Sequence, residues 1–433
     1  MRSRLVTIAA VIAVLISLVA LWMAVSARRE SASGEWGNQM PNIRVSVDRV
    51  KDSAERTRME RYVNDLQASK HVVQSFPGPS GEAIDCVDIY SQPALKRKGM
   101  EGHRVQLLPT NRPPEVQEGL RAREAKVRMP DQLFMLTGQT CPERTAPMGR
   151  LTMDTLKRFR TLDDFLRKEG NIRKPIGGGS GSAPHEWAHA SRGVSNWGGE
   201  SIFNLFSPYV QKEDEFSLSQ MWITRGGGSN LQTVEGGWQV YEDLYGDWRA
   251  HLFIYFTPDN YGSGGCYNTS CTGFVQVANT VYLGGGFTNY SVRGGEQWEF
   301  KLLWYKDGTN GHWWLKYGDT WVGYYPRSLF NANGLRDAAD NVDFGGEIVN
   351  TKPDGQHTRT DMGSGHWPYE GYSWTAYQRA IRYVDTSNYY QRATKLSRSV
   401  TNDQCYDLSL DSSSGGWEEY FYFGGSGRNS SCP

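Results

Sequence analysis

The sequence has no excess of either charge, because its 433 residues include 47 Lys and Arg and 47 Asp and Glu. A balanced chain lacks the basic surface that nucleic-acid binding requires, so the composition argues against that class of protein and against a strongly anionic partner. Histidine is scarce, with eight residues, and cysteine is limited to six. The length allows two or three domains with a substantial core.

The N-terminus begins with Arg2 and Arg4, followed by an uncharged apolar run from Leu5 to about Ala27. This pattern is typical of an export signal, and the small residues at 25–27 offer a signal-peptidase site. The run is longer than the usual ~7–15-residue hydrophobic region, so it also has the length of a membrane anchor. We expect residues 1–27 to be a cleaved signal peptide of a secreted protein, with a retained anchor as the alternative.

The cysteines are even in number, which in an exported chain indicates disulfides rather than free thiols or metal ligands. The cysteine count alone does not determine the pairing. Order along the chain suggests the pairs Cys86–Cys141, Cys266–Cys271 and Cys405–Cys432.

Composition divides the chain before residue 185 into three segments. Residues 28–75 are polar, and the spacing of their apolar positions predicts one amphipathic helix. Residues 76–170 form a smaller module that carries the first two cysteines and closes with a helical pattern. Residues 171–184 read NIRKPIGGGSGSAP, which predicts a linker because glycine and proline disfavour regular structure.

From His185 to the end of the chain, Trp, Tyr and Gly dominate. Segments such as QTVEGGWQVY, HLFIYFT and QWEFKLLWYK alternate apolar and polar residues between turn signals. Such spacing is typical of an antiparallel sandwich or barrel. We therefore predict a mainly β protein, in which an antiparallel β-sandwich domain at 185–433 follows a small α+β domain.

The first residues of this region, His185-Glu186-x-x-His189, have the spacing of a zinc metallopeptidase motif. That motif needs a helix, because one helical turn brings both histidines to the same face with the glutamate as general base. Here Pro184 and the glycine-rich linker precede it and further glycines follow, so too few residues remain for a stable helix of ~10 or more. We expect the first strand of the sandwich here, with a zinc peptidase as the alternative.

Several longer blocks resemble the neprosin family, among them EFSLSQMWITRGGGSNLQTVEGGWQVYEDLYGDWRAHLFIYFTPDNY, GCYNTSCTGFVQV and NVDFGGEIVNTKPDGQHTRTDMGSGHWP. The upstream EAIDCVDIYSQPAL and CPERTAPMGR resemble the propeptide domain that precedes the catalytic domain in that family. The resemblance implies the zymogen of a glutamic-class prolyl endopeptidase built from two stacked antiparallel sheets. It also implies that the propeptide is removed at acidic pH and that no metal or other cofactor is needed.

The resemblance assigns the two catalytic glutamates to Glu235, in TVEGGWQV, and Glu347, in FGGEIVN. Two facing carboxylates cannot both ionise easily, so the pair holds one proton. The ionised member would take a proton from the attacking water, and the protonated member would donate to the carbonyl oxygen or the leaving nitrogen. The sequence does not tell which glutamate has which role.

Alternation along a strand at 232–240 places Glu235 and Gln239 on one face and Trp238 on the other. Glycines beside each glutamate, at 236–237 and 345–346, would let a peptide backbone approach closely. We take the substrate-binding candidates to be Trp222, Trp238 and Tyr325, whose aromatic rings can stack on proline, together with Gln239, which shares the face of Glu235. Other carboxylates, Asp343 among them, are interpreted as structural.

The predicted partners are proline-containing protein or peptide substrates and the chain's own propeptide as an inhibitor, with no nucleic acid, and no membrane unless 1–27 is retained. A Trp- and Tyr-rich sandwich is also compatible with a carbohydrate-binding module without catalysis. The separate N-terminal module and its linker favour a zymogen over that alternative. We expect activation cleavage between Lys168 and His185.

Overall fold

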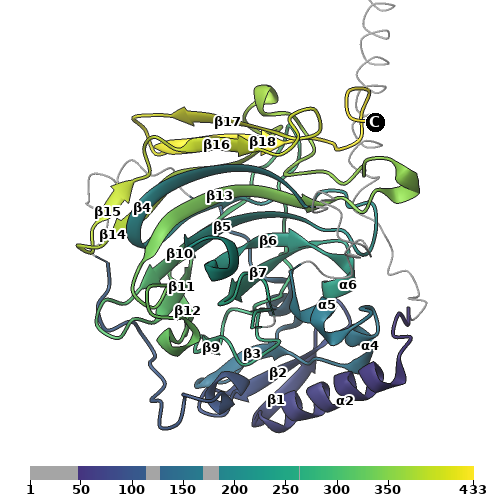
Figure 1. Cartoon of the computed structure of the whole chain (residues 1–433), viewed down its shortest axis with the longest axis vertical. Coiled ribbons are helices and arrows are strands. Elements are labelled where there is room, and N and C mark those ends of the chain that lie inside the picture. The colour runs from purple at the N-terminus through teal and green to yellow at the C-terminus, as the bar shows by residue number, and fades with distance from the viewer. Residues whose placement is uncertain (1–46, 114–126, 169–184, 263) are drawn as a thin grey trace, which may run out of the picture. The chain divides into compact units, whose positions relative to one another are not determined.

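The computed structural model describes residues 47–113, 127–168, 185–262 and 264–433. From Asp48 onward these form a small α+β region followed by a large antiparallel β-sandwich (Figure 1). The predicted fold class is therefore confirmed. The apolar run at 1–27 and the linker at 171–184 lie outside the described residues. Among the helices that are described, none has the length and apolar character needed to cross a membrane.

Within its described residues, the N-terminal region combines three α-helices with a three-stranded antiparallel sheet in the order β1-β2-β3. Polar caps fix where the helices begin, because the side chains of Asp52, Thr152 and Thr161 each accept a hydrogen bond from a backbone N–H in the first turn. The disulfide Cys86–Cys141 ties β2 to the segment before β3. The elements are α2 (Ser53–Ala68), β1 (Val72–Pro77), β2 (Ala83–Asp88), β3 (Thr145–Gly149), α4 (Met153–Leu156) and α5 (Leu162–Leu166).

One layer of the sandwich has the strand order β8-β7-β6-β5-β13-β4. The strand β4 is long and belongs to both layers, because its first half pairs with β13 and β16 and its second half with β10 and β14. The elements of this layer are β4 (His185–Asn204), β5 (Ser217–Arg225), β6 (Gln232–Val240), α6 (Glu242–Tyr245), β7 (Ala250–Thr257), β8 (Cys266–Tyr267) and β13 (Ala339–Val349).

The second layer extends from β4 in two directions, through β10-β11-β12-β9 on one side and β14-β18-β17 on the other. All its pairings are antiparallel. Its strands are β9 (Val275–Gln276), β10 (Glu299–Lys306), β11 (Trp313–Tyr317), β12 (Thr320–Tyr325), β14 (Ala376–Asp385), β15 (Tyr390–Arg392), β16 (Ser397–Val400), β17 (Asp407–Ser412) and β18 (Glu419–Gly424).

The main core lies between the two layers and takes every second side chain of their strands. On β6 the core side chains include Val234 and Trp238, and on β13 they include Phe344 and Ile348. The alternate positions of β6 and β13 therefore point to the other face of the layer. That face carries both predicted catalytic glutamates.

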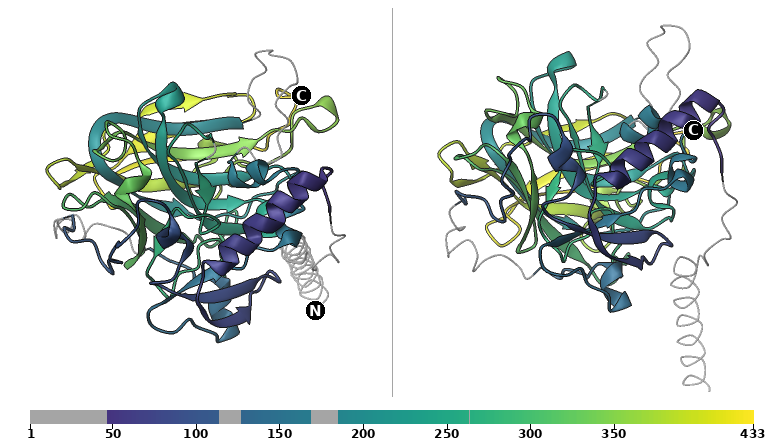
Figure 2. Two further views of the ribbon diagram at one scale, coloured as in Figure 1. Left: turned by 60° about the horizontal axis from the view of Figure 1, so that its bottom comes forward. Right: turned by 90° about the horizontal axis from the view of Figure 1, so that it is seen from below.

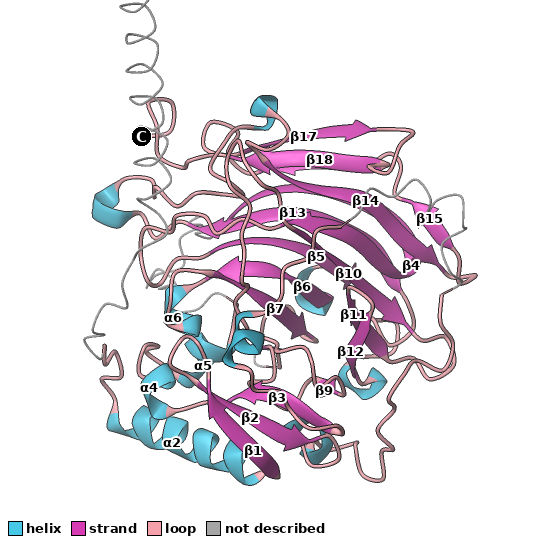
Figure 3. Ribbon diagram, turned by 180° about the vertical axis from the view of Figure 1, so that it is seen from behind, coloured by secondary structure: helices cyan, strands magenta, loops and turns pink. Residues whose placement is uncertain are grey.

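A second apolar cluster covers this other face and joins it to the N-terminal region. Met59 of α2 and Phe165 of α5 pack there with Phe216, Phe253 and Tyr255 of the sandwich. The helix α2 lies beside α4 and α5 (Figure 2), and these helices gather on one side of a structure made mostly of strands (Figure 3). The N-terminal region thus packs on the face that holds the glutamates.

Candidate active site

The register of three neighbouring strands places Glu235 and Glu347 on either side of Gln220. On β5, Gln220 lies opposite Gly237 of β6 and Gly345 of β13. All three positions share the face that carries the glutamates, and the two glycines add no side chain to it. The floor between the glutamates is therefore open except for Gln220.

Of the glycines beside the two glutamates, Gly237 and Gly345 lie on the face that carries the glutamates. Gly236 and Gly346 face the core instead, where a side chain at Gly346 would lie 2.6 Å from the ring of Phe423. These two glycines permit close packing between the layers and do not contribute to the open floor.

Lys168 bridges the two glutamates. Its Nζ lies 2.7 Å from Oε2 of Glu235 and 2.7 Å from Oε2 of Glu347. All three side chains are buried, with exposed fractions of 3% or less. Burial disfavours the ammonium, but the two carboxylates outweigh it and raise the pKa of Lys168. Lys168 is the last described residue before 169–184, the stretch that includes the predicted linker.

Glu347 has two further partners on the sandwich itself. His185 Nδ1 lies 2.6 Å from Oε1, and the amide nitrogen of Gln220 donates to Oε2 over 3.1 Å. Burial opposes ionisation of Glu347, yet the Lys168 ammonium and His185 lower its pKa from 4.5 to about 2. Glu347 is therefore held in its ionised form.

Glu235 is held by hydroxyl groups. Thr233 Oγ1 and the phenol of Tyr261 each donate to Oε1 of Glu235 over 2.7 Å. Both donors bind the same oxygen, and Lys168 Nζ donates to the other. The two glutamates thus differ in their surroundings, since Glu347 has an imidazole and an amide where Glu235 has two neutral hydroxyls.

The segment Leu166 to Lys168 lies on the same face as the glutamates. Tyr255 OH donates to the backbone oxygen of Leu166 over 3.4 Å, and Arg167 Nε donates to the backbone oxygen of Gly262 over 2.9 Å. These contacts place the end of the N-terminal region over β7 and β6, next to the carboxylates. The segment therefore covers part of the surface that a substrate would need.

A second ionisable pair lies on this face beyond Glu347. His189 Nδ1 is 2.7 Å from Asp343 Oδ1. The rings of His189 and Trp222 form an edge-to-face contact with centroids 6.2 Å apart. Burial lowers the pKa of His189, but the bond to Asp343 outweighs it and the net shift is upward. Asp343, interpreted from the sequence as structural, thus orients a histidine within the predicted site.

The zinc interpretation of His185, Glu186 and His189 is wrong, because these residues lie in β4 and not in a helix. Four residues along a strand span roughly 13 Å, and the two histidines bind Glu347 and Asp343. The side chain of Glu186 points to the opposite face.

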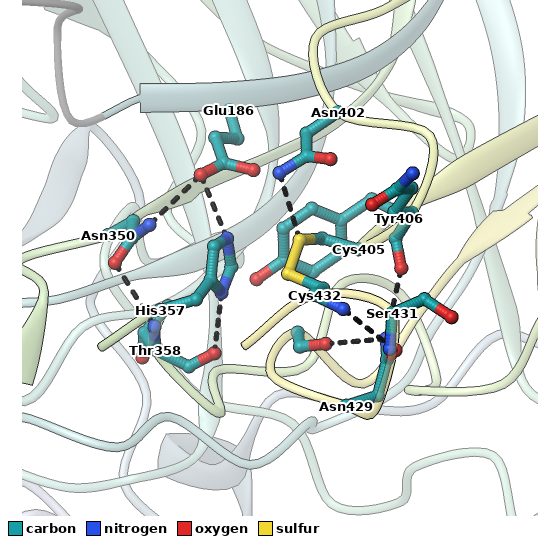
Figure 4. The surroundings of a disulfide bond; sticks show 12 residues. Glu186, Asn350, His357, Thr358, Asn402, Cys405, Tyr406, Asn429, Ser431 and Cys432 are labelled. Atoms are coloured by element: carbon teal, nitrogen blue, oxygen red, sulfur yellow. Dashed lines mark hydrogen bonds and ion pairs between the residues drawn. A yellow bond between two sulfur atoms is a disulfide. The ribbon is translucent and has the colours of Figure 1, made fainter.

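Glu186 lies instead in a buried polar cluster beside the disulfide Cys405–Cys432 (Figure 4). Its Oε1 accepts hydrogen bonds from Asn350 Nδ2 over 3.0 Å and from His357 Nε2 over 2.9 Å. Within the described parts of the chain, one group of three possible metal ligands is found, namely His357 with these two cysteines. Both cysteines are consumed by the disulfide, so that group does not form a metal site.

The structure separates the four predicted substrate-binding residues. Trp238 and Tyr325 are fully buried in the core between the layers, so they do not line the site. Trp238 donates to the backbone oxygen of Asn204, and Tyr325 stacks on Trp304. Trp222 and Gln239 share the face of the glutamates, where the ring of Trp222 lies 5.3 Å from Lys168 Nζ.

The three disulfides form as order along the chain suggests, joining Cys86 to Cys141, Cys266 to Cys271 and Cys405 to Cys432. Sequence reasoning missed Lys168 as a site residue, and it missed Gln220, Thr233 and Tyr261. Alternation could have found Thr233 and Gln220, because each shares a strand face with the site. Lys168 and Tyr261 lie outside the strands and carry no such signal.

These features define a β-sandwich whose central sheet holds a pair of buried glutamates covered by an N-terminal domain. The chain belongs to the neprosin family, because the Neprosin family matches residues 213–426 and the Neprosin activation peptide matches residues 75–191. Family membership supports a glutamic peptidase preceded by its own activation peptide. The helix α2 lies before both matches.

Two solved structures illustrate the wider similarity. The first is scytalido-glutamic peptidase with a peptide-based transition state analog, at 10% sequence identity and a TM-score of 0.31, covering 56% of this chain and 98% of that one. The second is SCP-B, a member of the Eqolisin family in complex with the tripeptide Ala-Ile-His. It has 8% identity, a TM-score of 0.30 and the same coverage.

Proposed function

We propose that the protein is the secreted zymogen of a glutamic endopeptidase that cleaves after proline at acidic pH. The observation that carries the proposal is the bridge from Lys168 Nζ to Glu235 and Glu347, at 2.7 Å to each. In this state both carboxylates are buried and bound to the ammonium group of one residue of the N-terminal domain. Neither can contact a water molecule and a substrate together, so the uncleaved chain is latent.

Cleavage between Lys168 and His185 would free the N-terminal domain to leave. A water molecule at the position of the Lys168 ammonium would lie within hydrogen-bond distance of Oε2 of Glu235 and Oε2 of Glu347. Two carboxylates that share such a site hold one proton between them. The propeptide lysine therefore occupies the position from which the nucleophile would attack.

The surroundings of the two carboxylates support one assignment of the acid and base roles. Glu347 keeps His185 and Gln220 after Lys168 leaves, and both favour its ionised form. Glu235 keeps only neutral donors, and both bind Oε1. The shared proton is therefore on Oε2 of Glu235, directed toward the substrate. Glu347 is the general base and Glu235 is the general acid.

The reaction then needs no metal. Glu235 donates a hydrogen bond to the scissile carbonyl oxygen while Glu347 takes a proton from the attacking water. The new C–O bond gives a tetrahedral intermediate, and the proton on Glu347 passes to the leaving nitrogen as the C–N bond breaks. Return of the carbonyl leaves Glu235 protonated and Glu347 ionised, as at the start.

The preference for proline and for acidic conditions follows from the family resemblance and from the need for a singly protonated pair. Trp222 is the aromatic candidate that remains on the face of the glutamates, and its flat ring suits a rigid apolar substrate side chain. Export follows from the apolar run at 1–27. A glycan-binding module would not need two buried glutamates bound to a lysine of a second domain.

The test is cleavage of a proline-containing peptide by the acid-treated protein at several pH values, with and without a chelator. We expect cleavage after proline at acidic pH, no effect of the chelator, and loss of cleavage in Glu347→Gln. A matched exposed variant, Glu296→Gln, keeps full activity. Unchanged cleavage in both Glu235→Gln and Glu347→Gln would overturn the glutamic mechanism. Glycan binding without any cleavage would support the carbohydrate-binding alternative.

A further inference from the structure

Tyr261 reaches one of the two glutamates from outside the sheet. Its hydroxyl donates to Oε1 of Glu235 over 2.7 Å, and its ring stacks on Tyr255 with centroids 6.0 Å apart. Burial and the neighbouring carboxylate raise the pKa of Tyr261 well above its usual range, so the phenol stays a hydrogen-bond donor at every working pH. Tyr261 follows β7, in the turn that leads to β8.

The backbone of this turn has an unfavourable conformation at two consecutive residues. Asn260 and Tyr261 have φ angles of 56° and 55°, in the left-handed region that a bulky aromatic residue rarely adopts. Such a conformation is energetically unfavourable and persists only where the surroundings impose it. Backbone strain of this kind is concentrated at functional sites, which makes the position of the Tyr261 side chain informative.

Hydrogen bonds from the turn to β7 and to the residue before β6 hold this conformation. The N–H of Asn260 donates to the backbone oxygen of Leu231 over 2.9 Å, and the N–H of Tyr261 donates to Thr257 Oγ1 over 2.8 Å. Leu231 directly precedes β6, the strand that carries Glu235. The turn is therefore tied to the same strand that its phenol contacts.

We propose that Tyr261 is a positioning residue of the peptidase reaction, which holds Glu235 so that its free oxygen faces the substrate. The inference rests on the proposed function and adds a residue to it. Thr233 and Tyr261 both occupy Oε1, and both remain when Lys168 leaves. Two donors on one oxygen fix the rotation of the carboxyl group and direct Oε2 toward the open floor beside Gln220.

The same contact is also expected to affect the pH–rate profile. A hydrogen bond to a carboxylate favours the ionised form, so removal of a donor favours the protonated form of the carboxyl group. The proposed reaction needs Glu235 to be protonated, so loss of that proton would set the alkaline limb of the pH–rate profile. The titratable groups around Glu235 are Glu347, Tyr255, Tyr261, Tyr325 and, before activation, Lys168.

The test compares Tyr261→Phe with Tyr267→Phe in the acid-activated protein. Both rings contact Tyr255, and Tyr267 is a buried phenol whose hydroxyl binds Gln239 instead of a glutamate. We expect Tyr261→Phe to lower kcat roughly ten-fold or more with little change in KM. The alkaline limb of the pH–rate profile of this variant should move to higher pH by about 0.5 to 1 pH unit, with the acid limb unchanged. Tyr267→Phe should keep the wild-type profile.

Thr233→Val provides a second variant on the other donor, and it should move the alkaline limb in the same direction. Thermal unfolding of each activated variant establishes that it is folded. A pH profile of Tyr261→Phe that matches the wild type would overturn the inference while the glutamic mechanism stood. Failure of the proposed function itself would show differently, as unchanged cleavage in both glutamate-to-glutamine variants.

Discussion

Lys168 Nζ and Glu347 Oε2 lie 2.7 Å apart, and both side chains are almost completely buried. The contact joins the last described residue of the N-terminal domain to a strand at the centre of the sandwich. A buried carboxylate needs a compensating charge, and here the charge comes from the part of the chain that activation would remove. Under the proposed function, latency and release of the glutamate pair depend on the ion pairs of Lys168.

Replacing Lys168 with methionine should weaken latency. Methionine keeps the length of the side chain but leaves two buried carboxylates without their cation, and removing one partner of a buried ion pair costs about 3–5 kcal/mol. We expect Lys168→Met to cleave a proline-containing peptide sooner after a mild pH drop than the wild-type zymogen does. The measurement is peptide cleavage over time, with chain length followed by mass spectrometry.

The control for this variant is Lys157→Met, because Lys157 is about one-third exposed and forms a surface pair with the exposed Asp154. Surface pairs of this kind contribute little, about 0–1 kcal/mol. The control should activate like the wild type. If the Lys168→Met zymogen were as latent as the wild type, the segment before the linker would block the site without the charge of Lys168.

The stability of the closed zymogen should fall with acid over a defined range. The pKa of Glu347 is lowered from 4.5 to about 2 in this state, so its contribution is complete above pH 4.5 and is lost as pH falls toward 2. A shift of that size corresponds to about 3 kcal/mol. The measurement is the free energy of unfolding from pH 6 to pH 2 in the Glu235→Gln background, which slows self-cleavage.

The companion variant Lys168→Met/Glu235→Gln lacks the ammonium that lowers the pKa of Glu347. Its free energy of unfolding should be lower at pH 6 and should change less between pH 4.5 and pH 2. Equal slopes in the two proteins would mean that the Lys168 contact does not drive the acid response.

Much of the fold followed from the sequence because strands alternate visibly. The segment QTVEGGWQVY is the strand β6, and its alternation places Glu235 on one face and Trp238 on the other, as observed. The same alternation should have removed Trp238 from the substrate-binding candidates, since a residue opposite Glu235 faces the core. The family blocks supplied both glutamates, which composition could not distinguish from other strand carboxylates.

The rest of the site depends on contacts between distant segments. Lys168 is 67 residues from Glu235 and 179 from Glu347, and in the sequence a lysine just after a short helix resembles any exposed lysine. Tyr261 lies in a turn whose sequence, TPDNYGSGG, predicts only a change of chain direction. His185 begins the strand that was predicted there, but only the zinc alternative gave it a role, whereas the residue contacts Glu347.

The helix α2 should help to hold the propeptide against the sandwich, although α2 lies before the part of the chain that matches the family's activation peptide. Arg58 pairs with Asp163 of α5 at 2.6 Å, and Tyr62 OH donates to the backbone oxygen of Ser270 in the sandwich over 2.6 Å. Arg49, just before α2, also forms an ion pair with Asp243 of α6. Because α5 leads directly to Lys168, a helix that holds α5 also holds the blocking segment.

A cavity in α2 tests this role. Met59 is fully buried in the cluster beneath the helix, and Met59→Ala should destabilise the zymogen by about 2–5 kcal/mol. We expect faster activation at a given acidic pH and, once the N-terminal domain is removed, the same kcat and KM as the wild type. The exposed neighbour provides the control, Glu60→Ala. Unchanged activation kinetics in Met59→Ala would assign α2 no part in latency.

The two glutamates should respond differently to the same substitution. In Glu235→Gln the amide oxygen can still accept hydrogen bonds from Thr233 and Tyr261. The NH₂ group then takes the place of Oε2, where it can donate a hydrogen bond to the scissile carbonyl oxygen. In Glu347→Gln the general base is lost, and an amide cannot replace it. We expect Glu347→Gln to have no measurable cleavage and Glu235→Gln to retain a reduced rate, roughly 10²-fold below the wild type.

The pH–rate profile distinguishes Glu235 as the acid and Glu347 as the base from the reverse assignment. Glu235→Gln has no acid to lose, so its remaining activity should lack the alkaline limb and should extend to higher pH than that of the wild type. Glu235→Leu has a similar size but no donor, and it should lose the residual rate that the amide preserves. If Glu347→Gln retained the residual rate and Glu235→Gln had none, the two roles would be exchanged, and the hydroxyl groups around Glu235 would then serve to stabilise the general base.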